Sequence, residues 1–268
     1  MKKAYMIRFI IDTEHDPVFN MAADLYLLSR CSAENRIFVR FYAWKVPSIT
    51  VGYMQKASEV LDIEAVKREN VSWIKRPTGG RAVLHFQDLT YSCIFPRKMR
   101  YMGSTVQESY NVITTCLMEG MKEAGIDCQS HDSYDQLLEV RREVKLPCFL
   151  APNRDEIMVN GKKLVGSAQR RTTMGVLQHG SIPLTGYFRK LPLYLNISER
   201  ERLVQMRLLL QKSICTAEID PDLNSSILIE SLKKGFIKKI PLPWVEENWS
   251  SDEIQSIRNF KITEEQIQ

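Results

Sequence analysis

The chain has 268 residues, of which 44% are hydrophobic and 26% are charged. This length suits one large α/β domain, or one domain with a small appendage, and it allows a substantial core without disulfides or metals. The formal net charge of +5 is mildly basic. Without a dense Lys/Arg block or an RNA-binding signature, this charge does not favour nucleic acid as a partner. It is compatible with an acidic partner or an anionic ligand.

The cysteines are spread widely along the chain, at Cys31, Cys93, Cys116, Cys128, Cys148 and Cys215. They form neither a CxxC pair nor a Cys/His cluster, so no metal site is expected, and the spacing is unlike that of a secreted disulfide scaffold. Near the N-terminus, Arg8 and Asp12 interrupt the apolar run that a signal peptide would need. No stretch approaches the roughly 18 apolar residues of a membrane-spanning helix. We therefore expect a soluble cytoplasmic protein with no membrane partner.

In the first half of the chain, short apolar runs alternate with amphipathic segments. Strands are predicted at residues 6–11, 37–42, 48–53, 71–74, 81–85 and 90–95, and helices at 16–28, 62–68 and 104–124. The strand at 48–53 is expected to pair with that at 37–42, and the strands at 81–85 and 90–95 with each other. In the last of the helices, Ser104 is the expected N-cap, with the polar Gln107 three positions later.

The second half begins with a polar, weakly periodic segment at 128–147, which we interpret as a long surface loop with some helix. Three strand candidates follow at 156–160, 163–169 and 176–183, and Asn160–Gly161 is a strong hairpin signal. Helical patterns dominate from about residue 199. We expect a catalytic domain at 1–240 and a C-terminal tail or helix at 241–268. The whole pattern predicts an α+β fold with a mixed, largely antiparallel sheet and helices packed against it.

One candidate binding segment runs from Lys75 to His85, with the sequence KRPTGGRAVLH. Its adjacent glycines, Gly79 and Gly80, let the backbone turn tightly and approach a ligand closely. Exposed N–H groups there, with Arg76 and Arg81 nearby, would suit a phosphate or a polarised carbonyl. A loop that joins two strands is the simpler interpretation of the glycines alone. The glycine spacing matches neither a Walker A loop nor a dinucleotide fingerprint.

A second candidate segment is the lysine-containing strand NGKKLVGSAQ at 160–169. Strand alternation predicts that Lys163 and Val165 share one face, with Lys162 and Leu164 on the other. A lysine on a buried face is costly unless it is paired or used on an anionic ligand. Three small residues beside it leave room for a substrate: Gly166, Ser167 and Ala168. A solvated lysine pair at a hairpin remains the simpler interpretation of this strand alone.

A third candidate is Cys148, which lies between Pro147 and Pro152 at the end of the polar loop. A free cysteine is usually an inert small hydrophobe, and we expect this of the other five. A thiol exposed near Lys163 would be favoured as the thiolate. Whether the two side chains meet is decided by the tertiary fold.

Together these segments closely resemble the lipoate–protein ligase and octanoyltransferase family. The resemblance is carried by Thr78-Gly79-Gly80 with the trailing His85, by the strand that contains Lys163, and by Asn20-Met21-Ala22 near the start. It runs from about residue 8 to residue 184. It implies the biotin/lipoate ligase catalytic fold, which is related to class II aminoacyl-tRNA synthetase cores.

Within that family the chain looks most like the cysteine-dependent octanoyltransferases, because Cys148-Phe149-x-Ala151-Pro152 matches the segment that carries their acylated cysteine. The resemblance implies that octanoate arrives on acyl carrier protein and passes to Cys148 as a thioester. It then moves to a lysine of a lipoyl domain, such as the glycine cleavage H protein. No cofactor is implied, because the acyl group arrives activated. Cys148 is the expected nucleophile and Lys163 the group that polarises the carbonyl.

Substrate-binding roles are expected for the remaining motif residues, Arg76, Thr78, Gly79, Gly80, Arg81, His85, Gly166, Ser167 and Ala168. His85 could orient the site or shuttle a proton, and a structural histidine at a strand end fits equally well. The octanoyl tail needs an apolar tunnel, for which Val83, Tyr91 and Val165 are candidate lining residues, although a packed core explains them equally well.

Three alternatives stay open at this stage. An ATP-dependent lipoate ligase would form lipoyl-AMP in the same pocket, with Lys163 on the phosphate and Cys148 dispensable. Against it, Arg81 stands where ligases commonly carry a third glycine. An amidotransferase would take octanoate from the H protein, which the segment 177–184 fits less well. A non-catalytic acyl-carrier-binding protein would have lost the nucleophile, whereas this chain keeps both Cys148 and Lys163.

Overall fold

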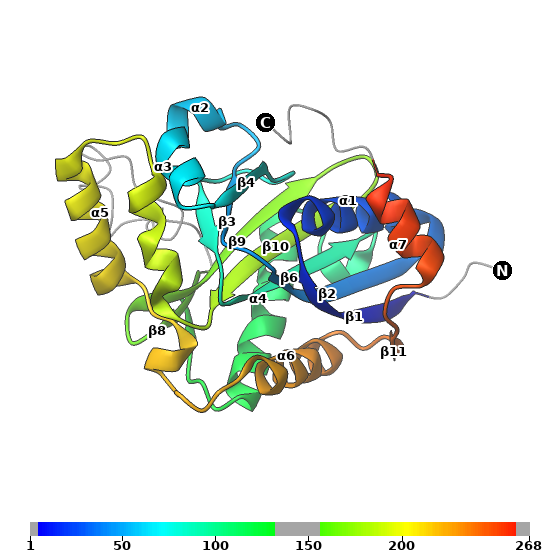
Figure 1. The fold of residues 1–268 in the computed structure, drawn as a ribbon. Coiled ribbons are helices and arrows are strands. Elements are labelled where there is room, and N and C mark those ends of the chain that lie inside the picture. The colour runs from blue at the N-terminus through cyan, green and yellow to red at the C-terminus, as the bar shows by residue number, and fades with distance from the viewer. Residues whose placement is uncertain (1–4, 132–155, 261–268) are drawn as a thin grey trace.

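The main sheet organises the fold, which Figure 1 shows as a ribbon. The computed structural model describes residues 5–131 and 156–260. The strand order in the main sheet is β11-β1-β2-β6-β10-β9-β8-β7. The strands are β1 Met6–His15, β2 Arg36–Trp44, β6 Asp88–Phe95, β7 Gln129–His131, β8 Glu156–Val159, β9 Lys162–Arg171, β10 Val176–Pro183 and β11 Trp244–Glu246. Strand β1 is parallel to β2 and β11, and the other neighbours are antiparallel. The predicted mixed, largely antiparallel sheet is confirmed.

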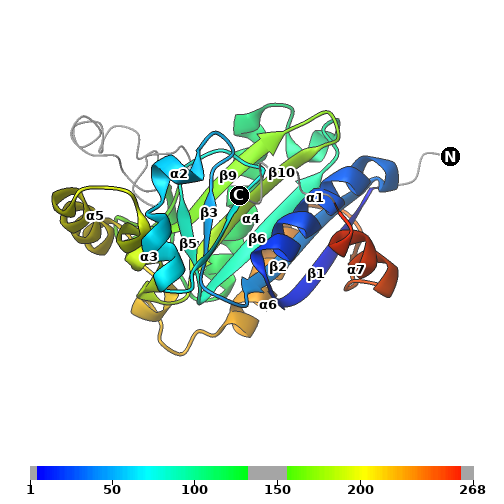
Figure 2. The ribbon, with the colours of Figure 1, turned by 45° about the horizontal axis from the view of Figure 1, so that its top comes forward.

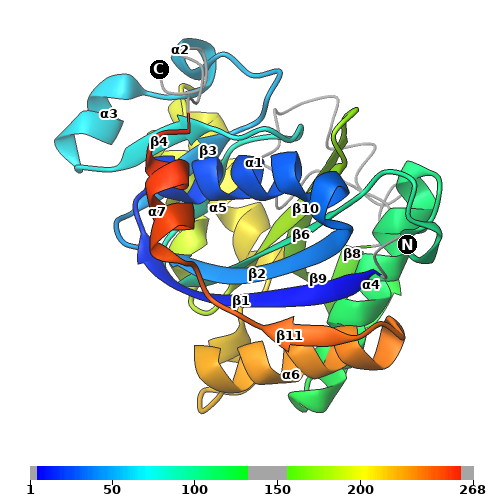
Figure 3. The same cartoon turned by 90° about the vertical axis from the view of Figure 1, so that its right-hand side faces the viewer.

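A second, three-stranded sheet has the order β4-β3-β5 and lies over the main sheet beside β9 (Figure 2). Its strands are β3 Ser48–Val51, β4 Ser72–Lys75 and β5 Val83–His85. The α-helices are α1 Pro17–Glu34, α2 Ala57–Val60, α3 Ile63–Arg68, α4 Val106–Glu123, α5 Glu199–Lys212, α6 Ser225–Lys239 and α7 Ser251–Arg258, and the 3-10 helices are η1 Arg100–Met102, η4 Gly186–Tyr194 and η5 Thr216–Glu218. Helix α1 and the small sheet cover one face of the main sheet, and α4 and α6 cover the other (Figure 3). Among the described residues, no helix is long and apolar enough to cross a membrane.

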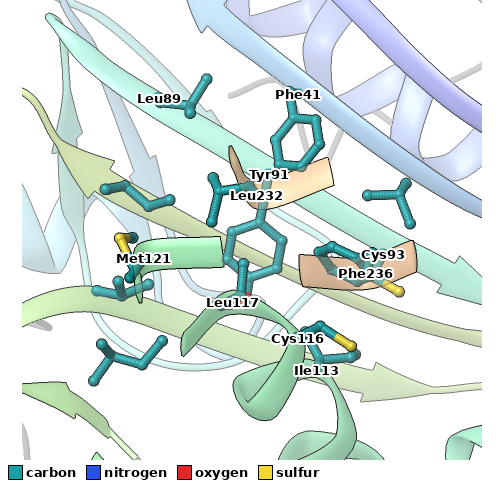
Figure 4. Packing of buried hydrophobic residues seen from close by; sticks show 14 of the residues in the cluster. Phe41, Leu89, Tyr91, Cys93, Ile113, Cys116, Leu117, Met121, Leu232 and Phe236 are labelled. Carbon is teal, nitrogen blue, oxygen red and sulfur yellow. The ribbon is translucent and has the colours of Figure 1, made fainter. Parts of the chain in front are cut away.

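The largest apolar core lies between the main sheet and helices α4 and α6, where Tyr91 and Phe41 of the sheet meet Leu117 and Phe236 (Figure 4). Burial of this kind contributes about 25 cal/mol per Å² of apolar surface. The N-cap of helix α4 lies one residue later than we predicted. The Thr105 hydroxyl, not that of Ser104, accepts from the amide of Glu108, and the Glu108 carboxylate accepts from the Thr105 amide in return.

Two predicted strand pairings are wrong. Strand β3 pairs with β4 and β5 instead of β2, and β5 pairs with β3 while β6 pairs with β2 and β10. Only two residues separate β5 from β6, which is typical of a hairpin. Here the positive φ of Gln87, 55°, occurs where the chain leaves one sheet for the other. Strands that are consecutive in the sequence usually pair with each other. Here the packing of two sheets overrides that preference.

The hairpin between β8 and β9 is confirmed, with Asn160 and Gly161 both at positive φ, 50° and 71°. The C-terminal residues, for which we expected a tail or helix, add edge strand β11 beside β1 and helix α7 against α1. The Arg8 guanidinium donates to both carboxylate oxygens of Glu253 on α7, at 2.6 and 2.9 Å. These contacts attach the segment after Pro243 to the sheet that carries the site.

Candidate functional site

The face of the main sheet under α1 and the small sheet is polar although it is buried. The alternation of β6 places Asp88 and Thr90 on this face, while Leu89 and Tyr91 enter the core on the other. The antiparallel register then sets Ser181 of β10 beside Thr90. A polar face in this alternation is normally solvated. Here the side chains have to find partners within the protein instead.

A pocket opens onto this face. Its lining includes Met21, Tyr42 and Trp44 from α1 and β2, Thr50, Val83 and His85 from the small sheet, and Gly166, Ala168 and His179 from the main sheet. Of the candidate tunnel residues, Val83 lines the pocket. Tyr91 and Val165 belong instead to the apolar core on the other face of the sheet.

Arg76 lies at the pocket with only 4% of its surface exposed. Its Nε donates to the Thr78 hydroxyl at 3.2 Å, and its Nη1 donates to the carbonyl and hydroxyl of Thr50 at 3.1 and 3.2 Å. Its Nη2 donates to the carbonyls of Gly79 and Arg81, at 2.7 and 2.8 Å. Since all three guanidinium nitrogens bind protein oxygens, the geometry favours shaping of the glycine loop over direct contact with a substrate phosphate.

The Gly79–Gly80 loop packs tightly against Gly52, which follows β3. A Cβ on Gly52 would lie 2.0 Å from the carbonyl oxygen of Gly80, so this position admits only glycine without a shift of the loop. Gly80 has a φ of 94° and is exposed. Within the described residues, no acceptor takes a hydrogen bond from the amide of Gly79 or Gly80. Both amides are therefore placed to donate to a bound group.

His179 connects the glycine loop to α1, and sequence reasoning did not single it out as a site residue. Its Nε2 lies 2.7 Å from the Thr78 hydroxyl and its Nδ1 lies 3.1 Å from the carboxylate of Asp24. Burial lowers the pKa of His179 more than Asp24 raises it. Burial alone would raise the pKa of Asp24, but the His179 hydrogen bond and the charge of Arg40 hold it below its usual value. At neutral pH the pair is thus a neutral imidazole on a carboxylate.

His85 repeats this arrangement on the other side of the loop. Its Nδ1 lies 2.9 Å from the Asp88 carboxylate and its Nε2 lies 3.0 Å from the Thr50 hydroxyl. The ring stacks on Trp44 with a centroid separation of 4.3 Å. Of the two roles left open for His85, this geometry favours orientation of the site, because both ring nitrogens already have protein partners.

Lys163 is buried, with 5% of its surface exposed, and its Nζ lies 2.5 Å from the Glu156 carboxylate. The predicted alternation is wrong here. A β-bulge between β8 and β9 lets both Leu164 and Val165 enter the apolar core. Lys163 stays outside that core and pairs with Glu156 of β8, and it is not one of the residues that line the pocket, although Gly166 of the same strand is. The interpretation as a solvated lysine pair does not hold for Lys163.

Ser167 and its neighbours divide between the two faces of β9. The Ser167 hydroxyl lies 2.7 Å from that of Tyr91 at the edge of the apolar core, whereas Gly166 and Ala168 flank it on the pocket face. Arg81 borders a neighbouring hollow with Met54 and Gln55. The structure therefore brings most of the predicted binding residues to one pocket rim.

The predicted nucleophile, Cys148, lies outside the described residues. The cysteines that are described have inert environments: burial raises the pKa of Cys31 and Cys128 to about 11 and that of Cys116 to about 12. Burial also raises the pKa of Cys93 and Cys215. A thiol needs a lowered pKa to serve as a nucleophile at neutral pH. In the described ranges there is also no cluster of three side chains that suits a metal ion.

A network of buried charges behind the pocket extends to the C-terminal segment. Arg40 is fully buried between Asp12 and Asp24, at 2.8 and 3.1 Å. The indole of Trp249 donates to Asp12 at 2.7 Å. Burial alone would raise the pKa of Asp12, but His15, Arg40 and Trp249 lower it to about 2. The carboxylate of Asp12 therefore stabilises the folded state.

Replacing Asp12 with asparagine should lower the free energy of unfolding at pH 7 by about 2 kcal/mol. The folded pKa of Asp12 is about 2, below the ordinary 3.8. The stabilisation that the Asp12 carboxylate gives to the folded state is therefore complete above pH 3.8 and is lost as the pH falls towards 2. Denaturant unfolding between pH 7 and pH 3 should show a weaker pH dependence in Asp12→Asn, with exposed Asp222→Asn as the control. Equal pH dependence in wild type and Asp12→Asn would contradict the prediction.

Comparisons with known proteins show the family of the chain. The lipoyl protein ligase A/B catalytic domain family matches residues 16–230, and the chain belongs to this family. The octanoyltransferase LipM of Staphylococcus aureus is 37% identical over 237 residues, which cover 86% of this chain and 85% of the relative. The octanoyltransferase LipM of Bacillus subtilis is also 37% identical, with 85% and 83% covered.

Solved structures with the same fold include a bi-partite lipoate protein ligase from Thermoplasma acidophilum. Its TM-score is 0.76 at 16% identity, with 96% of this chain and 91% of that chain covered. A lipoate-protein ligase A bound with ATP has a TM-score of 0.75 at 17% identity, with 96% and 94% covered. At these identities the likeness concerns the fold alone, and it confirms the expected lipoate ligase-like architecture.

Proposed function

We propose that this protein is an acyltransferase of lipoate biosynthesis that moves octanoate from acyl carrier protein, through a thioester on Cys148, to a lysine of a lipoyl domain such as the glycine cleavage H protein. The carrying observation is a buried Lys163 on β9, the strand whose Gly166 and Ala168 line the pocket, in a chain that is 37% identical to two octanoyltransferases over most of its length. Arg76, which holds the glycine loop, and the small residues of β9 line this pocket.

The reaction needs two displacements at one carbonyl carbon. First the Cys148 thiolate attacks the octanoyl thioester, a new C–S bond forms, and the carrier thiolate leaves and takes up a proton. Then the neutral amine of the acceptor lysine attacks the acyl-Cys148 carbonyl, a C–N bond forms and the Cys148 thiolate is regenerated, while the amine proton passes to solvent or a base. No ATP is consumed, because the thioester is already activated, and the cysteine divides the transfer into two easier steps.

Both steps develop negative charge on the carbonyl oxygen. The ammonium of Lys163 and the amides of Gly79 and Gly80 are the donors that we assign to this oxyanion. One such donor contributes on the order of 10²- to 10³-fold in rate. Thr78 and His85 act indirectly, since their polar groups bind Arg76, Thr50 and other protein residues around the loop.

The proposal is tested by intact-protein mass spectrometry after incubation with octanoyl-acyl carrier protein. Wild type should gain one octanoyl group and Cys148→Ser none. Cys128→Ser, at a half-buried cysteine with a raised pKa, is the matched control and should keep the adduct. Transfer to purified H protein should then proceed without ATP. An adduct that persists in Cys148→Ser, or octanoylation that requires free octanoate and ATP, would overturn the proposal in favour of a ligase.

A further inference from the structure

Two hydrogen-bonded chains of the same composition converge on Arg76. One runs from Asp24 through His179 to Thr78, and the other runs from Asp88 through His85 to Thr50. Both threonine hydroxyls lie 3.2 Å from a nitrogen of Arg76. The two chains start on different elements, α1 and β6, and each crosses the space between the sheets.

We assign a direction to each hydrogen bond from the donors and acceptors that each group offers. Arg76 can only donate, so each threonine oxygen accepts from it and keeps one hydroxyl proton and one further lone pair. The Nε2 atom of each histidine lies within 3.0 Å and receives that proton. Each Nδ1 must then carry the ring proton, which it donates to the carboxylate of Asp24 or Asp88. In this assignment both imidazoles carry a ring proton on Nδ1 and accept at Nε2.

Arg76 connects the two hydrogen-bonded chains to the glycine loop. Its Nη2 donates to the carbonyls of Gly79 and Arg81, so both carbonyls point towards Arg76. In a trans peptide the N–H points opposite to the carbonyl of the same plane. The amide of Gly80, which shares a plane with the Gly79 carbonyl, is therefore turned away from Arg76, and it has no acceptor among the described residues.

We propose that Asp24 and Asp88, acting through His179 and His85, are positioning residues that lock Arg76 and thereby aim the amide of Gly80 at the reacting carbonyl. The two histidines act as hydrogen-bond acceptors and not as proton carriers. The assignment of the reacting carbonyl rests on the octanoyl transfer proposed above. The histidine tautomers and the hydrogen bonds that hold Arg76 do not depend on that function.

The polar groups of both chains are buried, so each of them needs a hydrogen-bond partner within the protein. The carboxylates of Asp24 and Asp88, both histidine rings and Arg76 are each at most 6% exposed. A buried polar group without a partner costs about 1–3 kcal/mol. A proton added to either ring would make Nε2 a donor, and the threonine hydroxyl would then have to turn its own proton elsewhere and accept from both the ring and Arg76. For His179, burial together with the nearby charge of Arg76 lowers the pKa, in spite of Asp24.

The first test uses ¹⁵N-histidine NMR on the full chain, which contains four histidines. The His85 and His179 rings, assigned by single His→Gln replacements, should show the nitrogen pattern of the Nδ1–H tautomer. The His179 ring should keep it below pH 6.5, the ordinary pKa of the side chain. In Asp24→Asn the His179 ring alone should lose this tautomer, and in Asp88→Asn the His85 ring alone. An Nε2–H or doubly protonated ring in the wild type at neutral pH would overturn the inference whether or not the protein transfers octanoate.

The second test measures octanoyl transfer. Thr50→Val and Thr78→Val keep the side-chain shape, and each should lower kcat about 10- to 100-fold with little change in KM for the acyl carrier protein, because the loop amide is misplaced. Buried Thr114→Val on α4 is the matched control and should keep the wild-type rate. If the chains act through Arg76, each threonine change in an Arg76→Met background should alter kcat by less than about twofold.

The outcomes separate the two proposals. Wild type that transfers octanoate together with threonine variants of unchanged kcat would overturn the positioning roles and leave the transferase intact. Independent, additive losses in the Arg76→Met background would also overturn them. A wild type that carries both Nδ1–H tautomers but transfers no octanoate would support the hydrogen bonds assigned around Arg76 and overturn the proposed function.

Discussion

Lys163→Met is expected to slow octanoyl transfer about 10²- to 10³-fold, because the variant lacks the only ammonium that we assign to the oxyanion. Methionine is chosen since it is close to lysine in length and tolerates a buried position. Both half-reactions should slow, because each develops charge on the same carbonyl oxygen. Single-turnover formation of acyl-Cys148 and its decay in the presence of H protein measure the two steps separately.

A second change, at Glu156, provides the control that separates an effect on catalysis from an effect on stability. Lys163→Met leaves a buried carboxylate without the cation that lies 2.5 Å from it, so the variant should also be less stable. Adding Glu156→Gln removes that charge and should restore much of the lost unfolding free energy without restoring the rate. A double variant that recovers both stability and transfer would show that Lys163 acts through folding alone. Unchanged transfer in Lys163→Met would remove it from the catalytic site.

Gly52→Ala is expected to have the second large effect, because the new Cβ would lie 2.0 Å from the Gly80 carbonyl oxygen and 3.3 Å from the carbonyl carbon of Gly79. The loop cannot yield freely, since Arg76 holds the carbonyls of Gly79 and Arg81. We expect a loss of about 1–3 kcal/mol in unfolding free energy. We also expect a fall in transfer of about 10²-fold, as the loop amides leave their positions.

The matched comparison is Gly79→Ala, one residue before Gly80 in the same loop. A Cβ there meets no atom within 4 Å, so the unfolding midpoint should stay close to that of the wild type. Thermal unfolding of the two variants separates the close approach at Gly52 from a general intolerance of the loop to alanine. Equal midpoints for Gly52→Ala and wild type would show that the loop can move aside at little cost.

Much of the local structure could be read from short patterns because their causes are local. The hairpin at Asn160–Gly161 follows from two residues that accept positive φ, and the core face of α4 follows from apolar spacing. The family could be recognised from the glycine loop and the Lys163 strand. The buried polar face that includes His85, Asp88 and His179 left a weaker signal, namely polar residues at alternate positions of β6 and β10. That signal normally indicates a solvated face.

The sequence by itself determined the family, the strands and helices of the site, and the small residues that leave space beside Lys163. It could do so because turns, caps and alternation depend on residues close together in the chain. Only the tertiary structure decided that β3 and β5 leave the main sheet, and that a bulge at Leu164 places both Leu164 and Val165, but not Lys163, in the apolar core. It alone joined Asp24 to Thr78 through His179. Such contacts bring together segments as far as 155 residues apart, and they depend on how two sheets share buried polar groups.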